Sequence, residues 1–311
     1  MQESGSFSEI AGDLRARLLE GMSDNRLTPR QRQQMGNALA MIGDPRFRED
    51  RWFLPDEPDL GFVHIPEGPC ALGENADEVF LPGFYIARFQ TTVAQFRAFV
   101  TDAEFSPGNP ECLRGVDNHP VPWVNWFEAL AYTKWLGNRL QELAKEHPGG
   151  DSAESRALWA GLADGSLQCS LPSEAEWQKA AVGDSGWAYP WGDDIDTTRC
   201  NYKESELDST VAVGTFPEGA SPYGVLDMSG NAWDWQRTVW GPSLEEPLYD
   251  WPYKAEDGRE NIDAPSDLLR CMRGGGFPVE AARASSRYRD AVKPEDRDDA
   301  DSFRVVLTPR R

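Results

Sequence analysis

Apolar residues near the start of the chain recur at intervals of three and four. Ile10 and Leu14 fall on one face of a helix at this spacing. A second helix follows, with Thr28 at the N-cap position and Pro29 in the first turn, where these residue types are common. The pattern therefore predicts an N-terminal helical segment over residues 1–50, which is too small to bury a core by itself.

Residues 51–311 follow a different pattern, in which short apolar runs alternate with glycine and proline. Residues 148–168 predict a partly helical insertion, and residues 241–269 predict a long acidic loop. Strands mixed with helices and much irregular chain predict an α+β domain over residues 51–311. Two longer segments have clear helical periodicity, TTVAQFRAFVTDA and NWFEALAYTKWLGNRLQELAKEH.

The charge of the chain limits its partners. With 52 acidic and 31 basic residues, the net charge is −21. Such a field repels phosphate groups, so we expect no nucleic acid and no membrane as a partner. The first residues lack the pattern of a signal peptide, and no apolar stretch approaches the ~20 residues that span a bilayer. Five cysteines without a CxxC pair predict neither a disulfide framework nor a zinc site. We therefore expect a cytoplasmic protein.

Seven short motifs follow one another in the chain between residues 60 and 308. They are FVHIPEGPCALG, PVPWVNWFEALAYTKWL, LPSEAEWQKAAVG, YPWGDD, SPYGVLDMSGNAWDW, MRGGGF and SFRVVL. In order and spacing they resemble the formylglycine-generating-enzyme (sulfatase-modifying factor) family. The resemblance implies the C-type-lectin-like fold of that family, with short strands and mainly structural tryptophans. One motif also has a local explanation, because Ser173 and Glu176 have the spacing of a helix capping box.

The resemblance also implies calcium, because members of this family bind it around two of these segments. In one segment Asn231 and Asp234 flank a tryptophan, and their side-chain oxygens suit a hard cation. In the other, CNYKES and the residues after it, Asn201 and Asp208 are the candidates. The alternative is that these side chains only satisfy the amides of turns. We expect a structural calcium ion with these four residues as candidate ligands.

The resemblance further implies the site of catalysis. Catalytic members carry a pair of cysteines after the Gly-Gly run, which binds copper and oxidises a substrate cysteine. The matching positions hold Val279 and either Ala284 or Ser285, and Asp290 stands where a further cysteine is common. Neither valine nor alanine supplies the thiolate that holds copper. The chain therefore resembles a family member that lacks the catalytic cysteines, and we expect no copper.

Iron is not expected either. The related sulfoxide synthases hold iron with three histidines, whereas His64, His119 and His147 have no ligand spacing in this chain. A lone histidine is more often a satisfied polar residue than a metal ligand. An atypical metal-dependent oxidase or oxygenase of the same superfamily, with ligands of another kind, is the alternative function.

Residues 278–301 are predicted to bind a protein or a small ligand. Loops at this end of C-type-lectin-like folds tolerate sequence change because the scaffold fixes them, and arginine and tyrosine are frequent at binding hot spots. Some relatives are variable proteins of diversity-generating retroelements, which vary this same segment. The alternative is that the RYR triplet forms a buried strand whose arginines pair with acids of residues 241–269. The predicted contact residues are Val279, Arg283, Ser285, Arg287, Tyr288, Arg289 and Asp290.

A third hypothesis concerns residues 1–50. The stretch LTPRQRQQMGNALAMIGDPR resembles the helical segment that joins such domains to signalling modules in multidomain bacterial proteins. The chain would then be an accessory subunit of a bacterial signalling or defence system. In that case we expect residues 1–50 to dock on a separately encoded partner.

Overall fold

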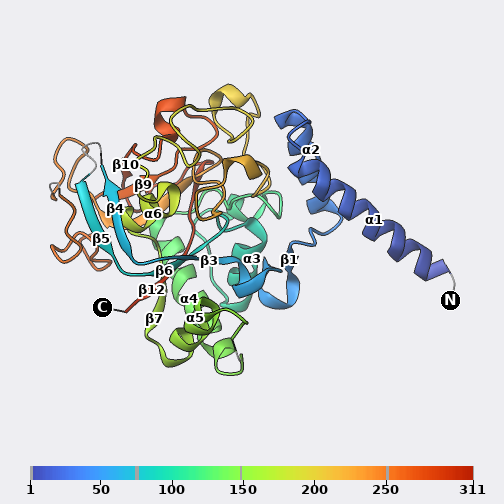
Figure 1. The fold of residues 1–311 in the computed structure, drawn as a ribbon, viewed down its shortest axis with the longest axis horizontal. Coiled ribbons are helices and arrows are strands. Elements are labelled where there is room, and N and C mark those ends of the chain that lie inside the picture. Colours follow the sequence, from blue (N-terminus) through green and yellow to red (C-terminus); the bar gives the residue numbers. More distant parts are fainter. Residues whose placement is uncertain (1–2, 74–76, 148, 250–251, 311) are drawn as a thin grey trace.

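The computed structural model describes residues 3–73, 77–147, 149–249 and 252–310. The chain begins with the two predicted helices, α1 (Glu3–Ser23) and α2 (Pro29–Met41). Thr28 caps α2 in a reciprocal capping box with Gln31. Figure 1 shows α1 reaching away from the rest of the molecule, which α2 adjoins. The predicted helical segment is confirmed, and its two helices meet the remainder of the chain differently.

Helix α2 packs on the domain that follows it. Arg32 is completely buried, and its guanidinium donates to the carbonyl oxygens of Thr198, at 2.9 Å, and Thr215, at 3.3 Å. Near the start of α1 the side chains of Ile10 and Leu14 remain 65% and 46% exposed. The two N-terminal helices are therefore held to the domain by α2, and apolar side chains in the first half of α1 are exposed to solvent.

Two four-stranded sheets form the centre of the domain. In one, the order is β3-β6-β12-β7, with the C-terminal strand β12 antiparallel to both of its neighbours. In the other, the order is β10-β9-β8-β11, and every residue of β8 is buried. The strands are β1 (Phe47–Arg48), β2 (Leu54–Pro55), β3 (Phe62–Ile65), β4 (Gly68–Leu72), β5 (Asp77–Leu81), β6 (Phe84–Ala87), β7 (Leu167–Ser170), β8 (Trp233–Val239), β9 (Arg270–Arg273), β10 (Asp290–Val292), β11 (Asp301–Ser302) and β12 (Val306–Pro309).

Helices α3 to α6 pack around the sheets (Figure 1). Each begins at a polar N-cap, and the capping box predicted for Ser173 and Glu176 at the start of α6 is confirmed. Helices α3 and α4 meet in an aromatic cluster around Phe99, Tyr132 and Phe303, with neighbouring ring centroids 5.2–5.7 Å apart. The helices are α3 (Val93–Asp102), α4 (Trp126–Ala144), α5 (Ala153–Asp164) and α6 (Glu174–Val182). The mixed content confirms the α+β fold with much irregular chain.

The glycine run after β9 lets two chain segments approach closely. Gly275 has a φ of +74°, which L side chains rarely adopt, and a Cβ there would lie 2.9 Å from Ala284 Cα. The same Cβ would lie 3.1 Å from Val279 Cγ2. The residues after the run therefore fold back against it. The glycine run thus allows residues 278–290 to pack at the edge of the sheet that contains β9 and β10.

Candidate functional site

Segment 281–287 lies against a second loop, residues 186–191, which contains the YPW motif. The backbone amide of Ser286 donates to the carbonyl of Ala188 at 2.7 Å, and the Ser285 hydroxyl donates to the same oxygen at 3.0 Å. The hydroxyl of Tyr189 donates to the Ala281 carbonyl at 3.0 Å. Two loops almost a hundred residues apart in sequence thus form one surface.

Arg283 is the centre of this surface. Its guanidinium lies 5.3 Å from the ring centroid of Trp233 and 5.4 Å from that of Tyr288. It also pairs with Asp290, and its side chain is 44% exposed. Both aromatic contacts are within the range of cation–π attraction. The arrangement holds a cation in a fixed position while leaving it accessible to solvent.

The adjoining loop adds aromatic rings that sequence reasoning missed. Trp187 is 39% exposed. Tyr189 and Trp191 stack with centroids 5.7 Å apart, and Arg199 lies 6.0 Å from the Trp191 ring. The density of aromatics in GWAYPW was the available signal. We call the whole the aromatic–arginine surface, which consists of Trp187, Trp191, Arg283, Arg287 and Tyr288. The buried rings of Tyr189 and Trp233 support it, because Tyr189 stacks on Trp191 and Trp233 contacts Arg283.

Not every predicted contact residue belongs to this surface. Val279 is buried, and its backbone carbonyl accepts from the amide of Lys203. Arg289 is turned inward to an ion pair with Glu174, in which the arginine is 18% exposed and the glutamate 2%. Both residues support the scaffold. Arg287, by contrast, is exposed, and its guanidinium donates to the Gly186 carbonyl.

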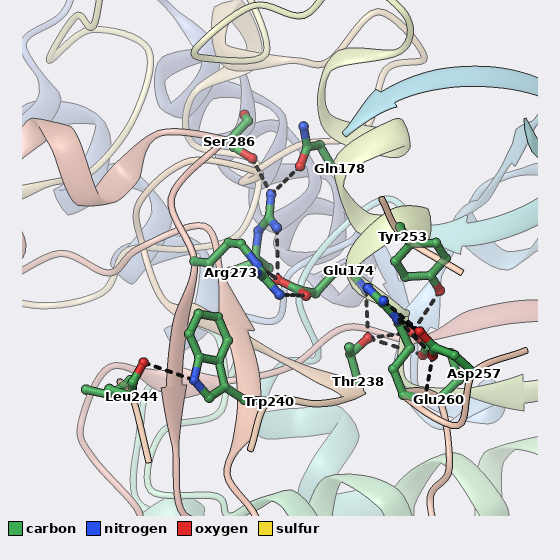
Figure 2. Close-up of polar contacts among 12 residues, drawn as sticks. Glu174, Gln178, Thr238, Trp240, Leu244, Tyr253, Asp257, Glu260, Arg273 and Ser286 are labelled. Atoms are coloured by element: carbon green, nitrogen blue, oxygen red, sulfur yellow. Dashed lines mark hydrogen bonds and ion pairs between the residues drawn. The ribbon is translucent and has the colours of Figure 1, made fainter. Parts of the chain in front are cut away.

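Glu174, the first residue of α6, is buried next to the aromatic–arginine surface and forms ion pairs with two arginines. Its carboxylate contacts Arg289 and also Arg273, whose Nη1 lies 3.1 Å from Oε1. Burial raises the pKa of Glu174, but the two guanidinium groups outweigh burial and lower the pKa to about 2. Figure 2 shows that the guanidinium of Arg273 also donates hydrogen bonds to the Gln178 side chain and to the Ser286 carbonyl. The backbone of the surface loop is thereby tied to α6.

Two of the four candidate calcium ligands lie together. Asn201 Nδ2 donates to Asn231 Oδ1 at 3.3 Å and to the Ser209 carbonyl at 2.8 Å. Asn201 Oδ1 is buried and has no hydrogen-bond partner among the described residues. An orphaned amide oxygen of this kind is a ligand type that calcium accepts. Asn231 Oδ1 already accepts from the Val211 amide as well.

The other two candidates do not join them. Asp234 is completely buried, and its Oδ2 accepts from Arg304 at 2.7 Å and from Trp177 Nε1 at 2.8 Å. Asp208 has an 88% exposed side chain and faces Arg30 at 3.6 Å. Across the described ranges no group of three or more His, Cys, Asp or Glu side chains is placed to hold a metal ion. The structure therefore brings Asn201 and Asn231 together and leaves Asp208 and Asp234 apart from them, engaged with arginines.

The positions implied for the cysteine pair are adjacent and apolar. Val279 and Ala284 flank Gly275, and both are buried. Cys271 precedes them in β9, and burial raises the pKa of its thiol well above the usual value. A buried thiol with a raised pKa is a poor nucleophile and a poor metal ligand. No described cysteine is disulfide-bonded.

All three histidines have local contacts, and the ring of His64 lies 5.0 Å from that of Tyr85. Burial lowers the pKa of His119 to about 4, so the ring is neutral at neutral pH. Its two nitrogens contact Thr210 and Asn37 at 3.1 and 2.7 Å. The ring of His147 stacks on Trp159, with centroids 3.8 Å apart. These contacts fit the interpretation of satisfied polar residues.

Comparison with solved structures shows the fold. Treponema denticola variable protein 1 matches with a TM-score of 0.56 at 20% identity, over 80% of this chain and 95% of that one. PvdO from Pseudomonas aeruginosa has the same TM-score and identity, over 79% and 94%. The fold is that of formylglycine-generating-enzyme-like, C-type-lectin-like proteins. No helix in the described part of the chain is long and apolar enough to cross a membrane.

Comparison of sequences shows the family. A formylglycine-generating enzyme from Thermomonospora curvata is 27% identical over 77% of this chain and 89% of its own length. A hercynine oxygenase from Mycolicibacterium thermoresistibile is 26% identical over 75% of this chain, which spans about half (53%) of that protein. Residues 55–309 match the family of the sulfatase-modifying factor enzyme 1-like domain. The chain therefore belongs to the sulfatase-modifying factor family.

Proposed function

We propose that the protein is a non-catalytic binding module of the cytoplasm, which takes up a protein or small ligand through residues 278–301 and the adjoining aromatic loop. The observation that carries this proposal is the placement of Arg283 between Trp233 and Tyr288, exposed on a backbone tied to α6. Tryptophan, tyrosine and arginine dominate binding hot spots, and a surface already held in place loses little entropy on binding.

The residues implied for catalysis support the same conclusion. Val279 and Ala284 are buried and have no sulfur, oxygen or nitrogen atom in their side chains. Ser285, the other residue implied for the second position, has a hydroxyl and no thiol, and this hydroxyl donates to the Ala188 carbonyl. The nearest thiol in sequence, Cys271, has a raised pKa. These residues do not fit a copper ion, which prefers thiolate ligands. The same scaffold without those ligands is suited to binding alone.

The decisive experiment compares matched variants for capture of a partner from source cells. The test variant is Arg287→Ala/Tyr288→Ala, and the control is Arg114→Ala, whose side chain is 71% exposed outside the surface. We expect the test variant to weaken binding of the captured partner by ~2 kcal/mol or more, a hot-spot amount. The control should bind as the wild type does. If the wild type, the test variant and the control bound the partner with equal affinity, the aromatic–arginine surface would not be the binding site.

Within this function, residues 278–301 are proposed as the variable segment of a diversity-generating retroelement. The likeness in fold to a protein named variable protein 1 supports this idea, although at 20% identity it concerns the fold alone. A near-identical template repeat beside a reverse transcriptase gene is the expected genomic context. Its absence would favour the other role, an accessory subunit of a bacterial signalling or defence system that docks through residues 1–50.

A second candidate is an atypical metal-dependent oxidase or oxygenase. The relatives named as a formylglycine-generating enzyme and a hercynine oxygenase favour it, at 27% and 26% identity. Elemental analysis of purified protein separates the two candidates, because stoichiometric copper or iron would support the enzyme. We expect neither metal. Peptides with the sulfatase-type cysteine motif should also stay unmodified by mass spectrometry when copper is added.

We also propose a structural calcium ion at the paired asparagines. The orphaned Oδ1 of Asn201 supports it, together with the adjacent Asn231 side chain. Calcium is a hard cation, and neutral amide and carbonyl oxygens can serve as its ligands. In this chain Asn201 and Asn231 come from separate loops, so an ion bound by both would tie those loops together. Asp234 is excluded as a ligand in this proposal because Arg304 already neutralises it.

A further inference from the structure

A cavity of about 550 Å³ lies between α4, the strands β7 and β12, and residues 260–262. This volume falls in the range of sites that hold small molecules, ~300–1,000 Å³. In Figure 1, α4 and β7 lie at the lower end of the domain and β10 near the upper end. The cavity is therefore separate from the aromatic–arginine surface, and nothing in the proposed function uses it.

One part of the cavity lining is apolar. Side chains from α4, α5, β7 and the 260–262 loop form this wall, and Gly137 lets α4 approach Cys169 of β7 closely, since a Cβ there would lie 3.1 Å from the Cys169 Cβ. A wall of this kind accepts the hydrocarbon part of a ligand. The apolar wall consists of Leu130, Leu162, Leu167, Cys169, Ile262 and Pro309.

The rest of the lining is rich in hydrogen-bond donors. Lys134, Asn138 and Gln141 come from α4, Gln168 from β7, and Arg310 follows β12. Within the described part of the chain, none of these five side chains makes a hydrogen bond or ion pair with another residue. Together they offer two cations and three amides with unused donors. A ligand with acceptor oxygens would satisfy them.

Glu260 is the carboxylate in the lining, and it repels a bound anion only weakly because neighbouring donors already engage it. Glu260 accepts from Arg237 Nε at 3.2 Å, from the Tyr253 hydroxyl at 2.7 Å and from the Thr238 hydroxyl at 2.9 Å. Figure 2 shows the last two of these groups converging on it. Arg237 is itself buried between Glu260 and Glu176, which lies 2.6 Å from it, so the cations left for a ligand are Lys134 and Arg310. In a chain of net charge −21, this is a locally basic site.

We propose that the cavity binds a small organic acid with an apolar body. Its carboxylate would lie among Lys134, Arg310 and the amides, since charge-assisted hydrogen bonds to carboxylates are the stronger kind. Its hydrocarbon or aromatic part would lie against the apolar wall. A neutral ligand would leave the two cations without an acceptor, and a cation would be repelled by them. The site does not depend on the proposed binding surface.

Two fluorescent probes of the same shape and opposite charge test this inference. Dansylglycine carries a carboxylate, and dansyl-ethylenediamine carries an ammonium group on the same ring system. For ligands of about 20 non-hydrogen atoms, a dissociation constant on the order of tens of micromolar is expected. We expect dansylglycine to bind full-length protein at this level and the amine to bind at least tenfold more weakly. Equal binding of both probes, or no binding of dansylglycine, would overturn the proposal.

Variants locate the bound probe. Lys134→Gln/Arg310→Gln removes both cations from side chains that are exposed and unpaired, so the fold should persist. We expect at least a tenfold loss of dansylglycine affinity. Lys145→Gln is the matched control, because Lys145 follows the last residue of α4 and lies outside this lining. Dansylglycine binding that survives the double variant unchanged would place the probe elsewhere and refute the site.

Discussion

Arg289 forms a bidentate ion pair with Glu174, with Nε 2.8 Å from Oε1 and Nη2 2.6 Å from Oε2. Its guanidinium also lies 4.5 Å from the ring centroid of Trp240. Arg287, two residues earlier, is exposed, and its guanidinium donates to a backbone carbonyl of the neighbouring loop. The RYR triplet is therefore divided, with one arginine in the scaffold and one on the surface.

This division predicts opposite effects of two similar substitutions. Arg289→Ala leaves the buried Glu174 with only Arg273, and breaking a buried ion pair costs about 3–5 kcal/mol. We expect Tm to fall by roughly 5–15 °C. Arg287→Ala should change stability by no more than about 0.5 kcal/mol, since it removes one exposed side chain. Thermal melts of both variants at pH 7 give the comparison, and equal Tm values would contradict it.

Local features of the fold were predictable because their causes lie within a few residues. Thr28 at the start of α2 and the Ser173–Glu176 capping box are satisfied by hydrogen bonds inside one turn of chain. The close approach at the glycine run also has a local cause, because Gly275 leaves room for Ala284 where a Cβ would clash.

The partners of charged residues were not predictable, because they are fixed by tertiary contacts. The alternative for RYR assigned its arginines to acids of residues 241–269, whereas Arg289 pairs with Glu174 of α6. In the same way, Asp234 was expected to face a cation site and instead faces Arg304, 70 residues later. No spacing in the sequence distinguishes such partners among 52 acidic residues.

Asp301 predicts an unusual dependence of stability on pH. Burial raises the pKa of its carboxyl to about 7, and repulsion from Asp298 and Asp296 adds to this effect. The folded state then keeps a proton that the unfolded state releases near pH 4. The stabilisation of the fold by the protonated Asp301 carboxyl is complete below about pH 4. It is lost as the pH rises through 7, where the folded state also releases this proton. The ionised carboxylate therefore destabilises the fold at neutral pH.

Asp301→Asn removes this ionisation. We expect the variant to match the wild type near pH 4.5 and to exceed it by about 1–3 kcal/mol at pH 8. The pKa of Asp227 is also raised by burial, to about 6, but that residue is present in both proteins and cancels in the difference. Urea melts at several pH values give the comparison. A constant difference between pH 4.5 and 8 would show that Asp301 does not titrate as described.

Calcium, if it binds at the asparagines, stabilises the fold by mass action. An excess of 100 times its Kd adds about 2.7 kcal/mol, so Tm should fall when EDTA replaces calcium. Asn201→Ala removes the orphaned oxygen and should abolish this difference. Asp208→Ala should leave the difference unchanged, because its side chain is exposed and faces Arg30. Asp234→Ala is unsuitable, since it breaks a buried ion pair whether or not calcium binds.

Two truncations separate the roles of α1 and α2. Deleting residues 1–14 removes the exposed Ile10 and Leu14 and none of the buried contacts of α2. We expect its Tm to stay within about 2 °C of the wild type. Deleting residues 1–50 also removes the buried Leu39 and Met22 side chains, each worth about 1.5–3 kcal/mol. That deletion should lower Tm by roughly 5–15 °C.

The shorter truncation is therefore the informative one for the proposed docking of residues 1–50 on a separate partner. The loss of a partner from the longer deletion would be confounded by loss of stability, because Arg32 and its contacts to residues 198 and 215 go with it. The apolar side chains of Ile10 and Leu14, which stay 65% and 46% exposed on the projecting α1, are the ones that the shorter truncation removes, whereas the 86% exposed Met41 of α2 remains. Partners recovered with the full chain and not with the 15–311 protein would support docking through α1. Identical partners would exclude docking through the first half of α1.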